Sequence, residues 1–284
     1  MHQRFTSAIA LLLFVSVGLA CSFLRPKPAL TWHVLLEIDA SMLDDASLLD
    51  KETAVRRTVS IIERRLEAAG IHTSSVLAQG TPPNGRILIS LPDVPDRERV
   101  TGLITSQGTL ELTGVVSPPN PSPVQTYSTE KDALASFGGS APGSRRVLPY
   151  MERAALPTDE QSSEGRQQPT SWVVVESTAI VNGSELRNAQ AIQRGVGEDY
   201  QISFSLGPEG AMKFGTWTEA HINDYLGVVI NGEVKSIAYI KSPIFDQGEI
   251  SGRFTKHSAE DLALILRSGG LPAPVKIIEE GNNK

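Results

Sequence analysis

The chain has 284 residues, of which 40% are hydrophobic and 20% are charged, and its formal net charge is -6. This composition is typical of a globular protein and excludes the disordered and fibrous classes, and the length allows two modest domains or one domain with a long insertion. Nucleic-acid binding is not expected, because neutralising phosphates requires a clustered surplus of Lys and Arg, and the sequence has no basic stripe.

The start of the chain has the pattern of an export signal. A basic start precedes an apolar run from Ala8 to Val17, and the small residues of 18–20 lead into Cys21. We therefore predict that residues 1–20 are a signal peptide, or alternatively a signal anchor, and that residues 21–30 tether the rest of the chain to a membrane.

Cys21 is the only cysteine, so the chain can form no internal disulfide. Its position resembles the lipobox of bacterial lipoproteins, in which the matching cysteine is lipidated, although Gly18 stands where that motif usually has leucine. An uncleaved anchor is the alternative, because residues 7–24 form an uncharged run just long enough to span a bilayer. A fully released form is the third. All three place the remaining chain on the periplasmic side of a bacterial membrane, and we predict a lipid anchor.

Residues 31–116 have the pattern of an α+β unit. Apolar residues recur at helical spacing from Val55 to Leu66, and Gly70 would end this helix as a C-terminal cap. The expected elements are a strand at 31–39, this helix, strands at 73–78 and 86–91, a helix at 96–105 and a strand at 109–116. The order β-α-β-β-α-β is that of the ferredoxin-like fold.

The composition changes between residues 117 and 171, where Pro, Ser, Gly and Gln dominate and little periodicity is present. A loop of this length without secondary structure is either functional or disordered. We interpret it as a mostly flexible linker.

Residues 172–257 have the pattern of a second α+β unit, followed by a helix and a strand in 258–284. Asn231 and Gly232 are typical of the turn of a two-residue β-hairpin, because both accept positive φ. The expected elements are strands at 172–176, 201–206, 226–230, 234–240 and 248–254, a helix from Ser184 to Gln193, a helix that starts at Pro208, a helix at 258–268 and a strand at 275–278.

The sequence contains no phosphate loop, no zinc-binding histidine pair and no nucleophile elbow, and its five histidines are scattered. We therefore predict no enzyme activity, no metal, no cofactor and no small-molecule substrate. His257, Ser258 and Asp261 supply the residue types of a hydrolase triad within five positions. We interpret Ser258 instead as a helix cap with Asp261 three residues later, because triads assemble by geometry in space.

Several segments are similar in order and spacing to the first periplasmic domain of the secretion accessory protein SecD, which has a base and a head. They are residues 35–39, 61–71 and 86–96 for the base, 207–214, 226–238 and 248–255 for the head, and 261–280 for the return toward the membrane. The family's Asp-Leu-Gln-Gly-Gly stretch is absent before Val34, and the sequence stops at Lys284, where SecD would enter its next membrane helix. We therefore expect a stand-alone exported protein without SecD's proton-coupled membrane part.

The resemblance implies a ferredoxin-like base (31–116) with an inserted α+β head (172–257), and hinges near 116–172 and 254–258. It also implies a membrane-tethered protein that binds translocating or unfolded polypeptide, or docks on the Sec translocon, to assist export. Candidate polypeptide contacts are apolar and aromatic side chains of the head, for each of which a core position is the competing interpretation. They are Phe214, Trp217, Tyr225 and Ile240.

Two other functions stay open at this point. The first is a structural or assembly lipoprotein that reuses the SecD head fold to bind another envelope partner, because fold does not fix function. The second is an envelope hydrolase, which would depend on Ser258.

Overall fold

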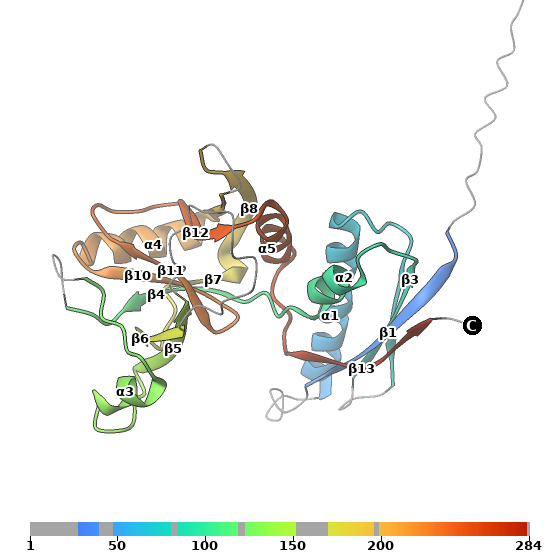
Figure 1. Cartoon of the computed structure of the whole chain (residues 1–284), viewed down its shortest axis with the longest axis horizontal. Coiled ribbons are helices and arrows are strands. Elements are labelled where there is room, and N and C mark those ends of the chain that lie inside the picture. The colour runs from blue at the N-terminus through green and yellow to red at the C-terminus, as the bar shows by residue number, and fades with distance from the viewer. Residues whose placement is uncertain are drawn as a thin grey trace, which may run out of the picture.

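The computed structural model describes residues 28–39, 48–80, 85–118, 123–151, 170–195 and 199–282. The export signal, Cys21 and most of the tether lie outside these described residues, so their predictions stay predictions. No helix in the described ranges is both long and apolar enough to cross a membrane. Figure 1 shows two bodies side by side, a smaller base that holds both ends of the described chain and a larger head.

The base is an antiparallel four-stranded sheet with two helices on one face. Its strand order is β13-β1-β3-β2. The strands are β1 (Leu30–Ile38), β2 (Ser75–Gln79), β3 (Arg86–Pro92) and β13 (Val275–Asn282), and the helices are α1 (Leu48–Ala68) and α2 (Arg97–Thr105). In β1, Trp32, Val34 and Leu36 alternate with half-buried residues, and they pack with Ile62 and Leu66 of α1 in the base core.

The ferredoxin-like fold is confirmed, but the strand that completes its sheet was predicted wrongly. The strand expected at 109–116 is present as β4 (Leu110–Val115), yet β4 pairs with head strands, and β13 takes the outer place beside β1. The base is therefore made of residues up to the end of α2 together with the C-terminal strand. Every residue of β4 except Glu111 is buried, as suits a strand in the middle of another sheet.

The head contains a closed ring of five strands. Neighbours in its six-stranded sheet follow the order β10-β11-β5-β6-β4-β7, and β10 also pairs with β4, which closes the ring. Its members are β4, β5 (Arg145–Met151), β6 (Thr170–Glu176), β10 (Tyr225–Ile230) and β11 (Glu233–Tyr239), with β7 (Val181–Asn182) attached to β4. A core of valines, among them Val173 and Val229, packs between these strands.

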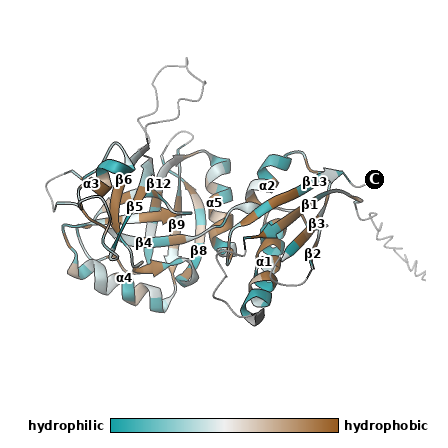
Figure 2. Ribbon diagram, turned by 90° about the horizontal axis from the view of Figure 1, so that it is seen from below, coloured by the Kyte–Doolittle hydropathy of each residue, from teal (hydrophilic) through white to brown (hydrophobic). Residues whose placement is uncertain are grey.

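A second sheet and two helices cover the ring. The sheet has the order β12-β9-β8, from β8 (Leu186–Gln193), β9 (Tyr200–Leu206) and β12 (Gln247–Phe254), and the helices are α4 (Pro208–Ala220) and α5 (Lys256–Ser268). The main head core lies between these elements and includes Leu112, Phe204 and Phe214. Figure 2 shows the hydrophobic colouring concentrated on these inner strands.

Three local expectations have clear outcomes. The hairpin at Asn231-Gly232 is confirmed, with φ of 51° and 78° and strands that pair along their length. The helix expected at 184–193 is wrong, because Asn182 caps only a short 3-10 turn and the following residues pair with β9 as strand β8. The strand and the helix predicted around Pro208 are confirmed as β9 and α4.

The interpretation of 117–171 as a mostly flexible linker is wrong for residues 123–151. This segment contains α3 (Glu130–Ala135), capped by the Thr129 side chain, and strand β5, which pairs with β6 over seven positions. A strand that is stabilised by partners distant in sequence carries little local periodicity, which explains why composition suggested a linker. Residues 119–122 and 152–169 lie outside the described ranges.

Candidate functional site

Helix α5 lies between the head and the base in both ribbon views (Figures 1 and 2). Ala259, Ala263 and Leu266 on one face belong to the head core, whereas Leu264 and Ile265 pack with Leu103 of α2. The helix was expected simply to return the chain to the base. Instead it is shared by both bodies, and only β13 after it belongs to the base alone.

The chain crosses between base and head in two short segments, at residues 106–109 and 269–274. The first segment joins the end of α2 to the start of β4, and the second joins the end of α5 to the start of β13. The two crossings run side by side, because the Leu271 amide donates to the Gln107 carbonyl at 2.7 Å. The hinges expected near 116–172 and 254–258 are therefore in the wrong place, since both of those segments lie within the head.

Arg65 of α1 ties the two crossings together. Its Nη1 donates to the carbonyls of Leu103 and Ser106, at 2.9 and 2.5 Å. Its Nη2 donates to the carbonyls of Gly269, at 3.0 Å, and Gln107, at 3.4 Å. The side chain is fully buried, so water cannot reach these carbonyls there, and the Arg65 guanidinium supplies their hydrogen bonds instead.

Burial lowers the pKa of the Arg65 guanidinium to about 10, with a smaller contribution from the neighbouring Arg64 charge. The group therefore stays cationic at neutral pH, and the carbonyl dipoles around it are the groups that offset its loss of water. Gly108 makes room for it: a Cβ there would lie 2.6 Å from Nη2, and the residue has a φ of +69°.

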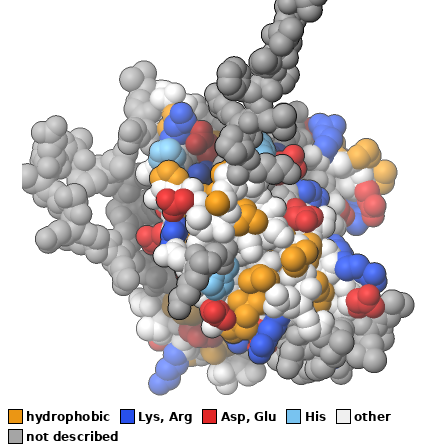
Figure 3. All heavy atoms as spheres, turned by 90° about the vertical axis from the view of Figure 1, so that its right-hand side faces the viewer, with side chains coloured by type: hydrophobic (Ala, Val, Ile, Leu, Met, Phe, Trp, Pro, Cys, Tyr) orange, Lys and Arg blue, Asp and Glu red, His pale blue; other side chains and the backbone are white. Residues whose placement is uncertain are grey.

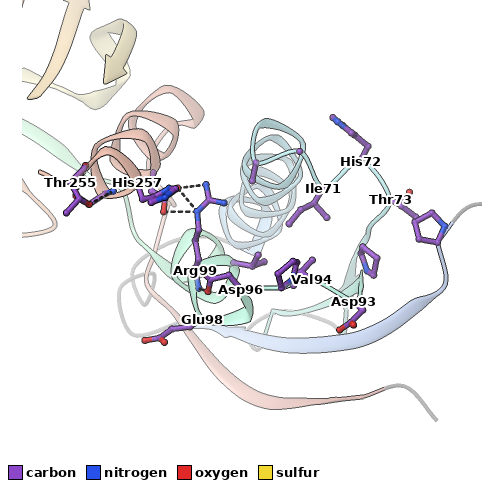
Figure 4. A pocket seen from close by; sticks show the side chains of 18 residues that line it. Ile71, His72, Thr73, Asp93, Val94, Asp96, Glu98, Arg99, Thr255 and His257 are labelled. Atoms are coloured by element: carbon purple, nitrogen blue, oxygen red, sulfur yellow. Dashed lines mark hydrogen bonds and ion pairs between the residues drawn. The ribbon is translucent and has the colours of Figure 1, made fainter. Parts of the chain in front are cut away.

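A pocket of about 1010 Å³ opens between the base and the first turn of α5. Its exposed lining is mostly apolar and comes from the α1–β2 connection, the β3–α2 connection and the first turns of α2 and α5. Figure 4 shows Ile71 and Val94 on the base side of this pocket and Thr255 and His257 on the α5 side, with His72 at its outer end.

Arg99 and Asp261 join the two walls of this pocket. The Arg99 guanidinium donates through Nε at 2.9 and 3.0 Å and through Nη2 at 2.6 Å to the Asp261 carboxylate, which joins α2 to α5 (Figure 4). This hydrogen bonding is the main cause that raises the pKa of Arg99. Both side chains are partly exposed, so the bidentate geometry rather than burial makes the pair stronger than an ordinary surface pair.

The same contacts decide the interpretation of Ser258. Thr255 is the N-cap of α5, and its hydroxyl accepts from the Ser258 amide at 3.2 Å, so Ser258 lies in the first turn and the prediction of Ser258 as the cap is wrong. The Ser258 hydroxyl donates to the Thr255 carbonyl at 3.1 Å, and Arg99 holds the Asp261 carboxylate. This arrangement is not a nucleophile, base and acid triad.

A double-mutant cycle measures the link between the two walls. We expect Arg99→Gln and Asp261→Asn each to lower the free energy of unfolding by about 1 kcal/mol, and the double variant to lose less than the sum of the two. Urea unfolding followed by circular dichroism gives the coupling energy. Strictly additive losses would show that the pair contributes nothing.

The four candidate polypeptide contacts of the head separate into two groups. Phe214 and Ile240 are buried in the head core, with 1% and 0% exposure, so the competing core interpretation holds for them. Trp217 and Tyr225 are only partly buried, and both line a second, smaller pocket in the head. The described residues contain no group of three or more His, Cys, Asp or Glu side chains that could hold a metal ion.

The base also exposes apolar surface. Leu77 of β2 is 56% exposed, and Ile277 and Ile278 of β13 are 39% and 44% exposed. Figure 3, seen from the base end, shows hydrophobic side chains grouped in a broken band among charged ones. These strands are the two edges of the base sheet, where an additional strand could pair.

Sequence patterns alone did not single out Arg65 or Arg99 as functional residues. Arg65 carries a usable signal, because Ile61, Ile62 and Leu66 place it on the buried face of α1, where an unpaired arginine has no ordinary role. The Arg99–Asp261 pair joins residues 162 positions apart, and nothing in the sequence links them.

Comparison with known proteins agrees with this architecture. Residues 157–273 match the family model of the SecDF P1 head subdomain, and residues 55–117 match that of the N-terminal part of the P1 domain of protein translocase subunit SecDF. A ferredoxin-like base interrupted by an inserted head defines a P1-type domain. The chain belongs to the SecD family through this P1 domain.

Two curated relatives show the extent of the similarity. Protein translocase subunit SecD of Koribacter versatilis is 35% identical over 230 residues, and SecD of Aquifex aeolicus is 34% identical over 230 residues. Each alignment covers 81% of this chain, but only 39% and 40% of the relative. The chain thus spans about two-fifths of the length of these relatives.

Solved structures show the same fold. The crystal structure of SecDF in the super-membrane-facing form has a TM-score of 0.63 and 25% identity, and covers 91% of this chain and 32% of that one. A structure described as part of a membrane component SecDF that enhances protein export has a TM-score of 0.60 and 23% identity. It covers 87% of this chain and 98% of that chain, which shows the shared fold over both bodies.

Proposed function

We propose that the chain is a non-catalytic binding module of bacterial protein export that receives translocating or unfolded polypeptide. The observation that carries this proposal is the mostly apolar pocket of about 1010 Å³ between base and head. Unfolded polypeptide exposes the apolar side chains that a folded protein buries, and a pocket of this size holds several of them. Docking on the Sec translocon belongs to the same proposal, because it would bring the pocket close to emerging chains.

The proposal includes attachment to the periplasmic side of a membrane through a lipid on Cys21 or through a signal anchor. The apolar run followed by a single cysteine supports it. Mass spectrometry of the mature N-terminus separates the two forms, because lipidation leaves Cys21 as the first residue and adds the mass of the acyl chains.

In-cell photo-crosslinking tests the polypeptide-binding proposal. With a photo-reactive amino acid in place of His72, which is exposed at the pocket rim, we expect crosslinks to exported polypeptides or to translocon subunits. The matched control is Glu52, which is exposed near the start of α1, about 24 Å along the helix from the end that precedes His72, and should give few such products.

The identity of the products decides between the hypotheses. If position 72 yields neither exported polypeptides nor translocon subunits above the level at position 52, the export function is wrong. Products dominated by other envelope proteins would instead support an assembly lipoprotein that reuses this fold.

A further inference from the structure

The second pocket lies in the head, where strands β4, β6 and β10 meet the C-terminal end of α4. It has a volume of about 460 Å³. Aromatic rings and carboxylates share its lining: the rings belong to Trp217, His221 and Tyr225, and the carboxylates to Glu176 and Asp224. Neither the fold nor the pocket between base and head requires this combination.

Two contacts give the pocket a defined shape. The rings of Trp217 and His221 stack with centroids 4.0 Å apart and an interplanar angle of 8°. His221 Nδ1 lies 2.7 Å from the Trp217 carbonyl, so Nδ1 is the donor and Nε2 of the neutral ring is left as an acceptor. A Cβ on Gly114 would lie 2.9 Å from the Glu176 carboxylate and 3.0 Å from the Trp217 ring, which shows how closely both approach strand β4.

The lining of the pocket carries more negative than positive charge, because it includes the carboxylates of Glu176 and Asp224 and one guanidinium, that of Arg145. Glu176 lies directly opposite Arg145 in the β5–β6 ladder, yet the Arg145 guanidinium is placed 5.5 Å from the centre of the Phe137 ring. Among the residues that the structure describes, no ion pair reaches the carboxylate of Glu176 or of Asp224. The C-terminal end of α4 adds the negative end of a helix dipole on the same side.

We infer that this pocket binds a basic side chain, arginine or lysine, of the polypeptide that the protein receives, an inference that rests on the proposed function. A guanidinium pairs with carboxylates through two parallel hydrogen bonds, and its flat face is attracted to aromatic rings. Glu176 and Asp224 supply the carboxylates, and Trp217 and Tyr225 supply aromatic faces beside them. The volume suits one long side chain with its adjoining backbone rather than a folded segment.

A titration with a defined peptide tests this inference on the full chain. The probe is an acetylated and amidated peptide with one central arginine among glycine and serine, and the matched probe has citrulline, which is nearly isosteric but uncharged. We expect the arginine peptide to shift the indole ¹⁵N–¹H signal of Trp217, assigned by its loss in Trp217→Phe, and the citrulline peptide to bind at least about fivefold more weakly.

Variants identify the carboxylates. Glu176→Gln and Asp224→Asn should each weaken binding of the arginine peptide about fivefold, whereas Glu219→Gln, which removes the same charge from an exposed position of α4, should change it less than about twofold. Unchanged indole signals of Trp32 and Trp172 would show that each variant is folded.

Three results overturn the inference: equal binding of the two peptides, no effect of Glu176→Gln, or tighter binding of free spermidine than of the peptide. Equal binding of the arginine and citrulline peptides would contradict only this inference, and the proposed binding of unfolded polypeptide would still stand. The opposite combination is also informative. If the arginine peptide binds more tightly than the citrulline peptide but position 72 crosslinks to no exported polypeptide, the pocket binds basic side chains and the export function is wrong.

Discussion

Replacement of Arg65 by methionine is expected to lower the free energy of unfolding by about 3–5 kcal/mol. Methionine fills much of the space but donates no hydrogen bond, so the carbonyls of Leu103, Ser106 and Gly269 lose their donor close to a buried helix packing surface. This loss is a large part of the total stability of an ordinary domain, which is about 5–15 kcal/mol. Urea unfolding followed by circular dichroism measures it.

Two further variants of α1 distinguish the loss of the Arg65 hydrogen bonds from a general effect of charge. Arg64→Met, one position away on the exposed side of α1, should change the free energy of unfolding by less than about 0.5 kcal/mol. Arg65→Lys should fall between the two, because an ammonium group is a single centre and cannot reach both crossings as the planar guanidinium does. If Arg65→Met unfolds at the same urea concentration as the unchanged protein, Arg65 does not hold the crossings together.

Hydrogen exchange adds the location of the effect. The amide of Leu271, bonded to the Gln107 carbonyl between the crossings, should exchange faster in Arg65→Met than in Arg64→Met.

Local chemistry made many elements of the fold predictable. The Asn231-Gly232 turn adopts the positive φ values that its residue types favour, and Pro208 begins a helix as a first-turn proline does. Such features depend on a few neighbouring residues. The similarity of separate segments to SecD then supplied the arrangement of base and head.

The failures concern contacts between residues far apart in the sequence. A strand pattern at 109–116 predicts a strand but not its partners, and these decided that β4 belongs to the head while β13 completes the base. In the same way, Leu186–Gln193 became a strand because it pairs with β9 along its length. Tertiary pairing chose the partners of β4, and it outweighed local propensity in β8.

The candidate site was predictable only in part, for a related reason. Aromatic residue types suggested Trp217 and Tyr225, which do line a pocket, and equally Phe214, which does not. Burial depends on which face of α4 meets the sheets, and Glu176 joins the pocket from β6, about 40 positions earlier in the chain. Neither fact is visible in the sequence around the aromatic residues.

Phe214→Ala tests the corrected role of that residue, and the expected loss in the free energy of unfolding is about 3–5 kcal/mol. The ring is 1% exposed and packs in the main head core, so its removal leaves a cavity that the surrounding sheets cannot fill. Thermal or urea unfolding of the full chain measures the loss. A surface contact for polypeptide would behave differently, because its truncation would weaken binding and leave stability nearly unchanged.

Met212 provides the matched control two positions earlier on α4. Its side chain is 73% exposed, so Met212→Ala should change the free energy of unfolding by less than about 0.5 kcal/mol although it also removes a large apolar group. The contrast separates burial from residue type, because both substitutions shorten an apolar side chain on one helix. Similar small losses in both variants would return Phe214 to the list of polypeptide contacts, and would place the head's binding surface along α4 instead of at its C-terminal pocket.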